Sequence, residues 1–152
     1  MSVPSKSHPS RLAAAVIVAL LLAAAVPLAT GVPAEARRAD NTPPTFAGLK
    51  SATTCIPGPI GGGRTTSYTL TWDPATDNHT PSKKIVYDIY QATTSGAEDF
   101  STPTYTTSPG ATSFTTPPLP TDQTFYFVVR ARDQAGNRDS NKVEREGQNL
   151  CL

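Results

Sequence analysis

The chain has 152 residues with nearly balanced charges, 13 Lys and Arg against 12 Asp and Glu, and a hydrophobic content of 38%. This length suits one ordinary domain. Nucleic-acid-binding proteins usually carry an excess of basic residues, and this chain has almost no such excess. We therefore expect no nucleic-acid partner.

The N-terminus has the layout of a secretory signal peptide. A short cationic region precedes an almost uninterrupted apolar run from Leu12 to Leu28, followed by small residues at Ala34 and Ala36. This pattern predicts a signal helix within residues 1–36, cleavage between Ala36 and Arg37, and secretion to the extracellular space. The alternative is an uncleaved anchor, because the apolar run approaches the roughly 17–25 residues that span a bilayer.

Cleavage leaves 116 residues with 11 basic and 11 acidic side chains. The mature chain is therefore formally neutral, and we expect it to carry no membrane element. It begins with an extended, Pro-rich segment, residues 37–45, because Pro fixes φ and pushes the residue before it toward extended geometry. A single domain then occupies residues 46–152.

Both cysteines, Cys55 and Cys151, belong to the mature chain. An even number of cysteines in an exported protein favours a disulfide bond. We predict a Cys55–Cys151 bond that joins the end of the first strand to the C-terminus. Free or intermolecular thiols are the alternative.

Strand signals recur along the mature chain, and no segment shows a sustained helical period. A loop dense in Gly and Pro follows the first strand at residues 56–63. About seven short strands with turn signals between them are typical of an antiparallel β-sandwich. The expected strands are residues 46–54, 67–72, 85–90, 102–107, 112–116, 125–132 and 142–146.

Apolar side chains alternate with polar ones in these strands, which places one side of each strand in the core. Tyr90, Tyr126 and Val128 fall on the opposite side, where we expect them to face water and form a candidate binding surface. The predicted core residues are Tyr68, Leu70, Trp72, Tyr87, Ile89, Phe114, Leu119, Phe125, Phe127, Val129 and Ala131.

Three stretches resemble the fibronectin type III domains of secreted bacterial proteins. They are the Asp-x-Thr-Pro-Pro opening at 40–44, Trp-x-x-Ala-x-Asp-Asn at 72–78 and Arg-Ala-Arg-Asp-Gln-Ala-Gly-Asn at 130–137. The resemblance implies an all-β, immunoglobulin-like fold with seven antiparallel strands over residues 46–152.

The sequence departs from this family at one position. The family usually has Tyr six residues after the corner Leu, here Leu119, with its hydroxyl bonded to nearby backbone. This chain has Phe125 there and Tyr126 next to it. Either the strand is shifted by one residue or the corner hydrogen bond is missing. We prefer the second, because a shift would turn Phe127 out of the core.

The mature chain offers little catalytic chemistry. No nucleophile, phosphate-loop or zinc motif is present, so we expect no enzyme activity and no cofactor. His79 lies in a polar loop without an evident acid–base partner. Several loop residues are of the type that calcium takes, but Asp and Asn also initiate turns, and we predict no metal site. These residues are Asp40, Asn41, Asp77, Asn78, Asp133, Asn137 and Asp139.

Two function classes remain open. The leading one is a secreted, non-catalytic binding or adhesion module that recognises an extracellular protein or a polysaccharide. The second is a structural spacer or cell-envelope-associated domain without a ligand of its own. An accessory domain that acts with a secreted glycoside hydrolase is a third alternative. A fold of this kind hosts many functions, so the choice depends on sites on the surface.

Overall fold

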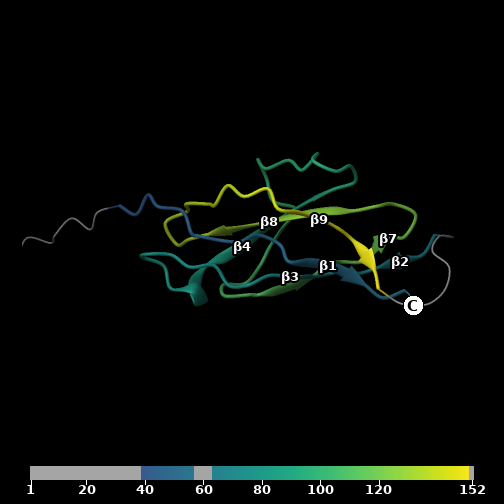
Figure 1. Cartoon of the computed structure of the whole chain (residues 1–152), viewed down its shortest axis with the longest axis horizontal. Helices are drawn as coiled ribbons and strands as arrows, with labels where there is room; N and C mark the ends of the chain where they lie inside the picture. The colour runs from purple at the N-terminus through teal and green to yellow at the C-terminus, as the bar shows by residue number, and fades with distance from the viewer. Residues whose placement is uncertain (1–38, 57–62, 151–152) are drawn as a thin grey trace, which may run out of the picture. The chain divides into compact units, whose positions relative to one another are not determined.

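The computed structural model describes residues 39–56 and 63–150 (Figure 1). The chain divides into the units Met1–Ala36 and Arg37–Leu152, and all described residues belong to the second unit. The predicted signal helix, its cleavage position at Ala36 and Arg37, and Cys151 lie outside the described residues. No helix within the described ranges is long and apolar enough to cross a membrane.

The described chain forms two four-stranded sheets and one separate strand pair (Figure 1). One sheet has the order β10-β1-β3-β6, with β10 at Gln148–Asn149, β1 at Ser51–Thr54, β3 at Thr69–Thr71 and β6 at Ser113–Thr115. The other has the order β5-β4-β8-β9, with β5 at Tyr105–Thr106, β4 at Val86–Ala92, β8 at Tyr126–Arg132 and β9 at Glu144–Glu146. The pair joins β2 at Thr65–Thr66 to β7 at Leu119–Pro120, and a 3-10 turn, η1, spans Ser82–Lys84.

The prediction of an all-β fold is confirmed, but the strand count differs. The seven expected strands correspond to β1, β3, β4, β5, β6, β8 and β9. Three two-residue strands, β2, β7 and β10, were not predicted, because two residues are too few for a periodic pattern. Strand β1 is shorter than expected, since Gly48 just before it has a positive φ of 88° that interrupts extended geometry.

Nearly all strand pairs are antiparallel, as β4 and β8 illustrate with Ile89 opposite Val129. The parallel pair is β1 with β10, in which Thr54 lies opposite Asn149. This pair places the C-terminal strand beside the end of β1, close to Cys55.

The core lies between the two sheets. The Trp72 ring centroid is 5.2 Å from that of Tyr87 on the opposite sheet, and the Tyr68 centroid is 5.6 Å from that of Phe127. Phe114 and Leu119 are partly buried and pack against this cluster. The fully buried members of the cluster are Leu49, Ala52, Tyr68, Leu70, Trp72, Ala75, Ile85, Tyr87, Ile89, Phe125, Phe127, Val129 and Ala131.

Strand β8 is not shifted relative to the sequence pattern. Phe125 is 3% exposed, and Phe127 and Val129 are fully enclosed. Tyr126 lies on the opposite face of the strand and is half-buried. A one-residue shift would exchange these two faces, so Phe125 occupies the inward position at this corner.

Candidate functional site

The predicted binding surface of Tyr90, Tyr126 and Val128 is wrong in one respect, because its residues are not open to solvent. Tyr90 and Val128 are each 1% exposed, and Tyr126 is half-buried. The period of two placed these side chains correctly on the side of the sheet away from the core. It could not indicate that another segment of the chain lies on that side.

The segment that covers them is the loop between β4 and β5, residues 93–104, which we call the cover loop. The Phe100 ring centroid lies 5.1 Å from the Tyr90 centroid in an edge-to-face arrangement. The Arg130 guanidinium carbon lies 3.6 Å from the Phe100 centroid and 5.7 Å from the Tyr90 centroid. These contacts cover Tyr90 on the outer face of the β5-β4-β8-β9 sheet.

Hydrogen bonds fix the cover loop to β9. The two carboxylate oxygens of Glu144 accept from Ser95 Oγ at 2.7 Å and from the Gly96 backbone N–H at 2.6 Å. Both bonds lower the pKa of Glu144. The neighbouring Glu98 is 9% exposed. Its pKa is raised by burial, then by its side-chain hydrogen bond with Glu144 and by the Glu144 charge.

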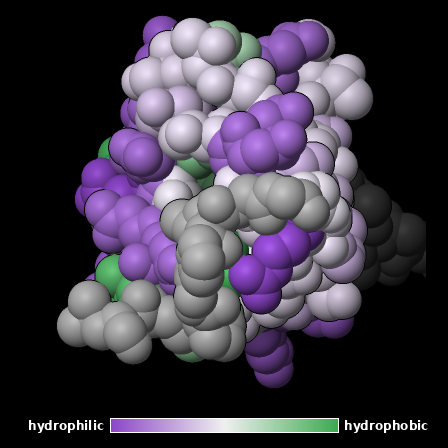
Figure 2. Space-filling view, turned by 90° about the vertical axis from the view of Figure 1, so that its right-hand side faces the viewer, coloured by the Kyte–Doolittle hydropathy of each residue, from purple (hydrophilic) through white to green (hydrophobic). Residues whose placement is uncertain are grey.

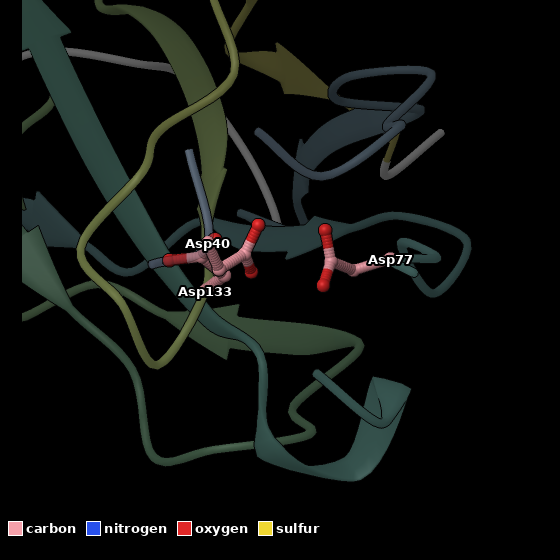
Figure 3. A group of neighbouring side chains, drawn as sticks. All are labelled: Asp40, Asp77 and Asp133. Atoms are coloured by element: carbon pink, nitrogen blue, oxygen red, sulfur yellow. The ribbon is translucent and has the colours of Figure 1, made fainter. Parts of the chain in front are cut away.

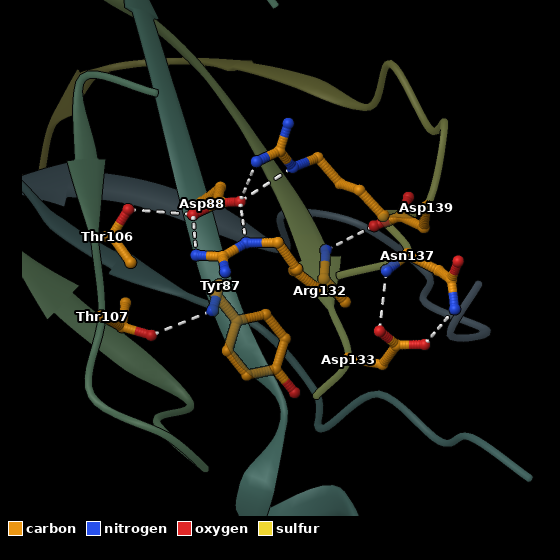
Figure 4. Close-up of polar contacts among 10 residues, drawn as sticks. Tyr87, Asp88, Thr106, Thr107, Arg132, Asp133, Asn137 and Asp139 are labelled. Carbon is orange, nitrogen blue, oxygen red and sulfur yellow. Dashed lines mark hydrogen bonds and ion pairs between the residues drawn. The ribbon is translucent and has the colours of Figure 1, made fainter. Parts of the chain in front are cut away.

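Asp88 is a buried carboxylate on the same face of the sheet (Figure 4). It accepts from Arg132 Nε at 2.8 Å, from Arg138 Nε at 2.8 Å and from Thr106 Oγ1 at 2.9 Å. Burial alone would raise its pKa, but the bonds from Arg132 and Thr106 and the charge of Arg138 lower it. A carboxylate engaged in this way stays ionised and ties β4, β5 and β8 together.

Three other carboxylates converge where the N-terminal segment meets two loops (Figure 3). Asp40 precedes the first strand, Asp77 lies between β3 and β4, and Asp133 lies between β8 and β9. One carboxylate oxygen from each lies within 4.8 Å of the others. Figure 3 shows the carboxylates of Asp77 and Asp133 facing each other across the cluster.

Local hydrogen bonds hold two of these carboxylates in place. Asp77 Oδ1 accepts from the His79 and Thr80 backbone N–H groups at 2.9 and 2.6 Å, as expected for an Asp that initiates a turn. Burial alone would raise the pKa of Asp77, but these backbone bonds outweigh it and lower the pKa. Asp133 accepts from the backbone and side-chain nitrogens of Asn137, both at 2.7 Å (Figure 4).

The third carboxylate, Asp40, lies beside the imidazole of His79. The two are joined by an Oδ1–Nδ1 contact of 3.4 Å, with the His79 side chain 59% exposed. His79 therefore has an acidic neighbour that the sequence did not reveal. This contact does not test the expectation that His79 has no catalytic role.

The sequence indicates that these aspartates are loop residues of the calcium-ligand type, but it does not indicate that they converge. Each lies in a separate loop, and no spacing along the chain relates residues 40, 77 and 133. The signal that could have found them is topological. The residues lie before the first strand, after β3 and after β8, and the sandwich brings these three positions to one end.

The comparison with solved structures gives a match at the level of the fold. No protein-family model matches the chain, and no curated protein matches it. Among solved structures, a fibronectin type III-like protein from Clostridium thermocellum is similar, with a TM-score of 0.49 and 22% identity. The match covers 73% of this chain and 98% of that one. The likeness concerns the fold alone.

Proposed function

We propose that the chain is an exported, non-catalytic β-sandwich domain that serves as a spacer or envelope-associated element outside the cell. The observation that supports this best is the burial of Tyr90 and Val128 on the outer face of the β5-β4-β8-β9 sheet. A ligand would need to reach Tyr90 and Val128, but Phe100 and Arg130 already pack on that face. The aromatic and aliphatic groups therefore stabilise the fold.

The character of the visible surface supports this proposal. Where Figure 2 leaves the described residues in view, hydrophilic and intermediate residues predominate, and hydrophobic ones are visible only as small, separate spots. Among the described residues, the one large hydrophobic side chain that is exposed is Leu150, at 63%. Contiguous apolar patches, by contrast, mark many protein interaction sites.

Export is the part of the proposal that rests on the N-terminal sequence. The cationic region, the apolar run and the small residues at Ala34 and Ala36 together support cleavage before Arg37. Intact-mass analysis of protein collected from the culture medium tests this. A secreted form that retains residues 1–36 would contradict it.

A second candidate function is recognition of a polysaccharide. A cleft of about 290 Å³ lies at the end of the sandwich near β10, and its polar lining includes Gln123, Glu146 and Asn149 around the edge of Tyr68. Such a size is at the lower limit of known ligand pockets, about 300–1,000 Å³. The amide and carboxylate groups of this lining can hydrogen-bond to the hydroxyl groups of a sugar.

A retention assay separates the two candidates. The purified chain and its Gln123→Ala and Phe100→Ala variants are incubated with isolated cell wall and with insoluble polysaccharides. A spacer predicts that the unmodified chain stays in the supernatant. Retention that Gln123→Ala abolishes and Phe100→Ala preserves would overturn the spacer proposal and support polysaccharide binding.

A further inference from the structure

Two oxygens of the three-aspartate cluster are enclosed and lack hydrogen-bond partners. They are Asp40 Oδ2 and Asp77 Oδ2. The Asp40 side chain is 11% exposed, and its other oxygen, Oδ1, accepts from the Thr42 N–H at 3.1 Å and lies 3.4 Å from His79 Nδ1. A buried acceptor without a partner costs free energy, and native proteins rarely tolerate one unless a water or an ion satisfies it.

The cluster also concentrates negative charge. Asp133 is 3% exposed, and its hydrogen bonds come from the neutral Asn137. The cation beside the cluster is His79, which is charged only when protonated. Neighbouring carboxylates repel one another in a poorly solvated place. A divalent cation between them would both neutralise the charge and occupy the free oxygens.

From these observations we propose that Asp40, Asp77 and Asp133 bind one calcium ion. Their oxygens lie within 4.8 Å of one another, about twice the 2.3–2.6 Å length of a calcium–oxygen bond. One ion between the three carboxylates therefore reaches all of them with small adjustments.

The ligand chemistry favours calcium over the other common divalent ions. All three side chains offer hard carboxylate oxygens, whereas zinc prefers nitrogen and sulfur ligands. The ligands come from three separate segments, which suits the variable geometry of calcium better than the near-ideal octahedron that magnesium demands. Water would complete the coordination.

The surrounding hydrogen bonds prepare the site. Asp77 uses Oδ1 for the two backbone N–H groups of its own turn, which leaves Oδ2 free for the ion. Asn137 Nδ2 donates to the Asp40 backbone oxygen at 2.9 Å and so keeps the N-terminal segment beside Asp133. Thr80 Oγ1 accepts from the Gln134 N–H at 3.2 Å, which joins the two loops.

Binding at this position joins the N-terminal segment to the sandwich. The segment also pairs with the body through Thr45 and Thr76, whose backbone groups exchange bonds of 2.8 and 3.0 Å. A calcium ion on Asp40 adds to the hydrogen bond that Asn137 already donates to the Asp40 backbone oxygen. The site would thus set how firmly a preceding segment is held. Calcium binding itself does not depend on the spacer function proposed above.

The test is a calorimetric titration of calcium chloride into the purified chain after treatment with a chelator. We expect saturable binding to one site with a dissociation constant of about 10⁻⁴–10⁻³ M, the range of extracellular calcium modules. Calcium at 10 mM should raise the melting temperature by several degrees, because a ligand that binds only the folded state stabilises it. Absence of saturable heat up to 10 mM would overturn the proposal.

Matched variants locate the site. Asp77→Asn retains an oxygen for the turn N–H groups and should weaken calcium binding at least tenfold, as should Asp133→Asn. Asp122→Asn, at an exposed aspartate outside the cluster, should change binding less than twofold. Circular dichroism of the calcium-free variants checks that each one folds.

Three further outcomes would contradict the assignment. Equal weakening by Asp122→Asn would show non-specific charge screening, and unchanged binding in Asp77→Asn would place the ion elsewhere. Magnesium or zinc binding more tightly than calcium would overturn the choice of ion. Hydrogen exchange at the Thr45 N–H should slow with calcium if the ion holds the N-terminal segment. All these measurements use purified protein, so they can fail without affecting the proposals of export or of a spacer.

Discussion

Arg130 lies over the ring of Phe100, with its guanidinium carbon 3.6 Å from the ring centroid. The two residues come from β8 and from the cover loop, which are far apart in the sequence. Arg130 Nε also donates to the Asn141 backbone oxygen at 3.0 Å. The cation–π contact therefore belongs to a set of long-range contacts that keeps the cover loop on the sheet.

Replacement of Phe100 by Ala should expose Tyr90 on the outer face of the β5-β4-β8-β9 sheet. We expect the free energy of unfolding to fall by about 1–3 kcal/mol, from the lost aromatic pair with Tyr90 and the lost contact with Arg130. Urea denaturation measures the loss, and a hydrophobic dye should bind the variant more strongly. Phe100→Leu is the control, since it keeps an apolar cover without the ring. Equal dye binding by the unmodified chain and Phe100→Ala would contradict the cover over Tyr90.

Glu98→Gln should stabilise the protein at neutral pH. Glu98 Oε1 is buried without a hydrogen-bond partner, and burial raises the pKa of this carboxyl. The pKa of Glu98 is therefore higher in the folded state than in the unfolded state. The stabilising contribution of Glu98 is fully present below the unfolded-state pKa. It is lost as the pH rises through the folded-state pKa. The side-chain amide that Glu98→Gln introduces cannot ionise, so the variant avoids this loss of stability. The amide can also donate a hydrogen bond to Glu144.

The size and pH dependence of this gain are both measurable. We expect about 1–3 kcal/mol at pH 7, the usual cost of an unsatisfied buried group, and little gain at pH 4. Thermal melts at the two pH values give the comparison. Glu146→Gln, at an exposed glutamate of β9, should change stability little at either pH. A uniform gain at both pH values would show that burial of the charge is not the cause.

Sequence patterns predicted the inner faces of the sheets better than the outer faces. Leu70, Ile89 and Val129 point inward because the period of two depends only on neighbours along one strand. Burial of Tyr90 depends instead on a loop that carries Phe100 back across the sheet. The meeting of Asp77 with Asp133 likewise depends on which loops the sandwich brings together. The periodicity within one strand indicates neither the cover over Tyr90 nor the approach of Asp77 to Asp133.

Asp88→Asn should be strongly destabilising. The substitution leaves Arg132 and Arg138 without the charge they share, and breaking one side of a buried ion pair typically costs about 3–5 kcal/mol. Asp73→Asn is the matched control, because its pair with Lys50 at 3.3 Å is exposed. Surface pairs of this kind contribute at most about 1 kcal/mol. Similar losses in the two variants would contradict a structural role for Asp88.

Protonation of the Asp88 carboxylate should lower the free energy of unfolding in acid. The bonds from Arg132 and Thr106 lower the folded pKa of Asp88 below its ordinary value of 3.8. The stabilising contribution is therefore present above the unfolded pKa and is lost as the pH falls through the folded pKa. Denaturation curves between pH 5 and pH 2 should show a smaller loss of stability in Asp88→Asn than in the unmodified chain.

Trp72→Ala should remove the centre of the core. The Trp72 ring packs on Tyr87, and its Nε1 donates to the Ala111 backbone oxygen at 3.0 Å. Truncation of a buried Trp costs about 3–5 kcal/mol, a large part of the stability of a small domain. His79→Ala, at an exposed loop residue, should stay within about 0.5 kcal/mol. A thermal melt compares the two, and a silent Trp72→Ala would contradict its place in the core.

Cys55 and Cys151 should be bonded to each other in the secreted protein. Cys55 is not a free cysteine, while Cys151 lies outside the described residues. The parallel pairing of β1 with β10 supports the bond, because the Leu150 N–H donates to the Thr54 oxygen at 2.9 Å. The residues that follow Thr54 and Leu150 are the two cysteines.

This bond would close a loop of about 96 residues, for which the chain-entropy model gives roughly 4–5 kcal/mol. Non-reducing peptide mapping of the secreted protein should therefore recover one peptide pair that joins Cys55 to Cys151. Cys55→Ser, Cys151→Ser and the double variant should lose similar amounts of stability, since each removes the same bond. An alkylatable thiol in the native protein, or a double variant much less stable than either single one, would show that the cysteines act separately.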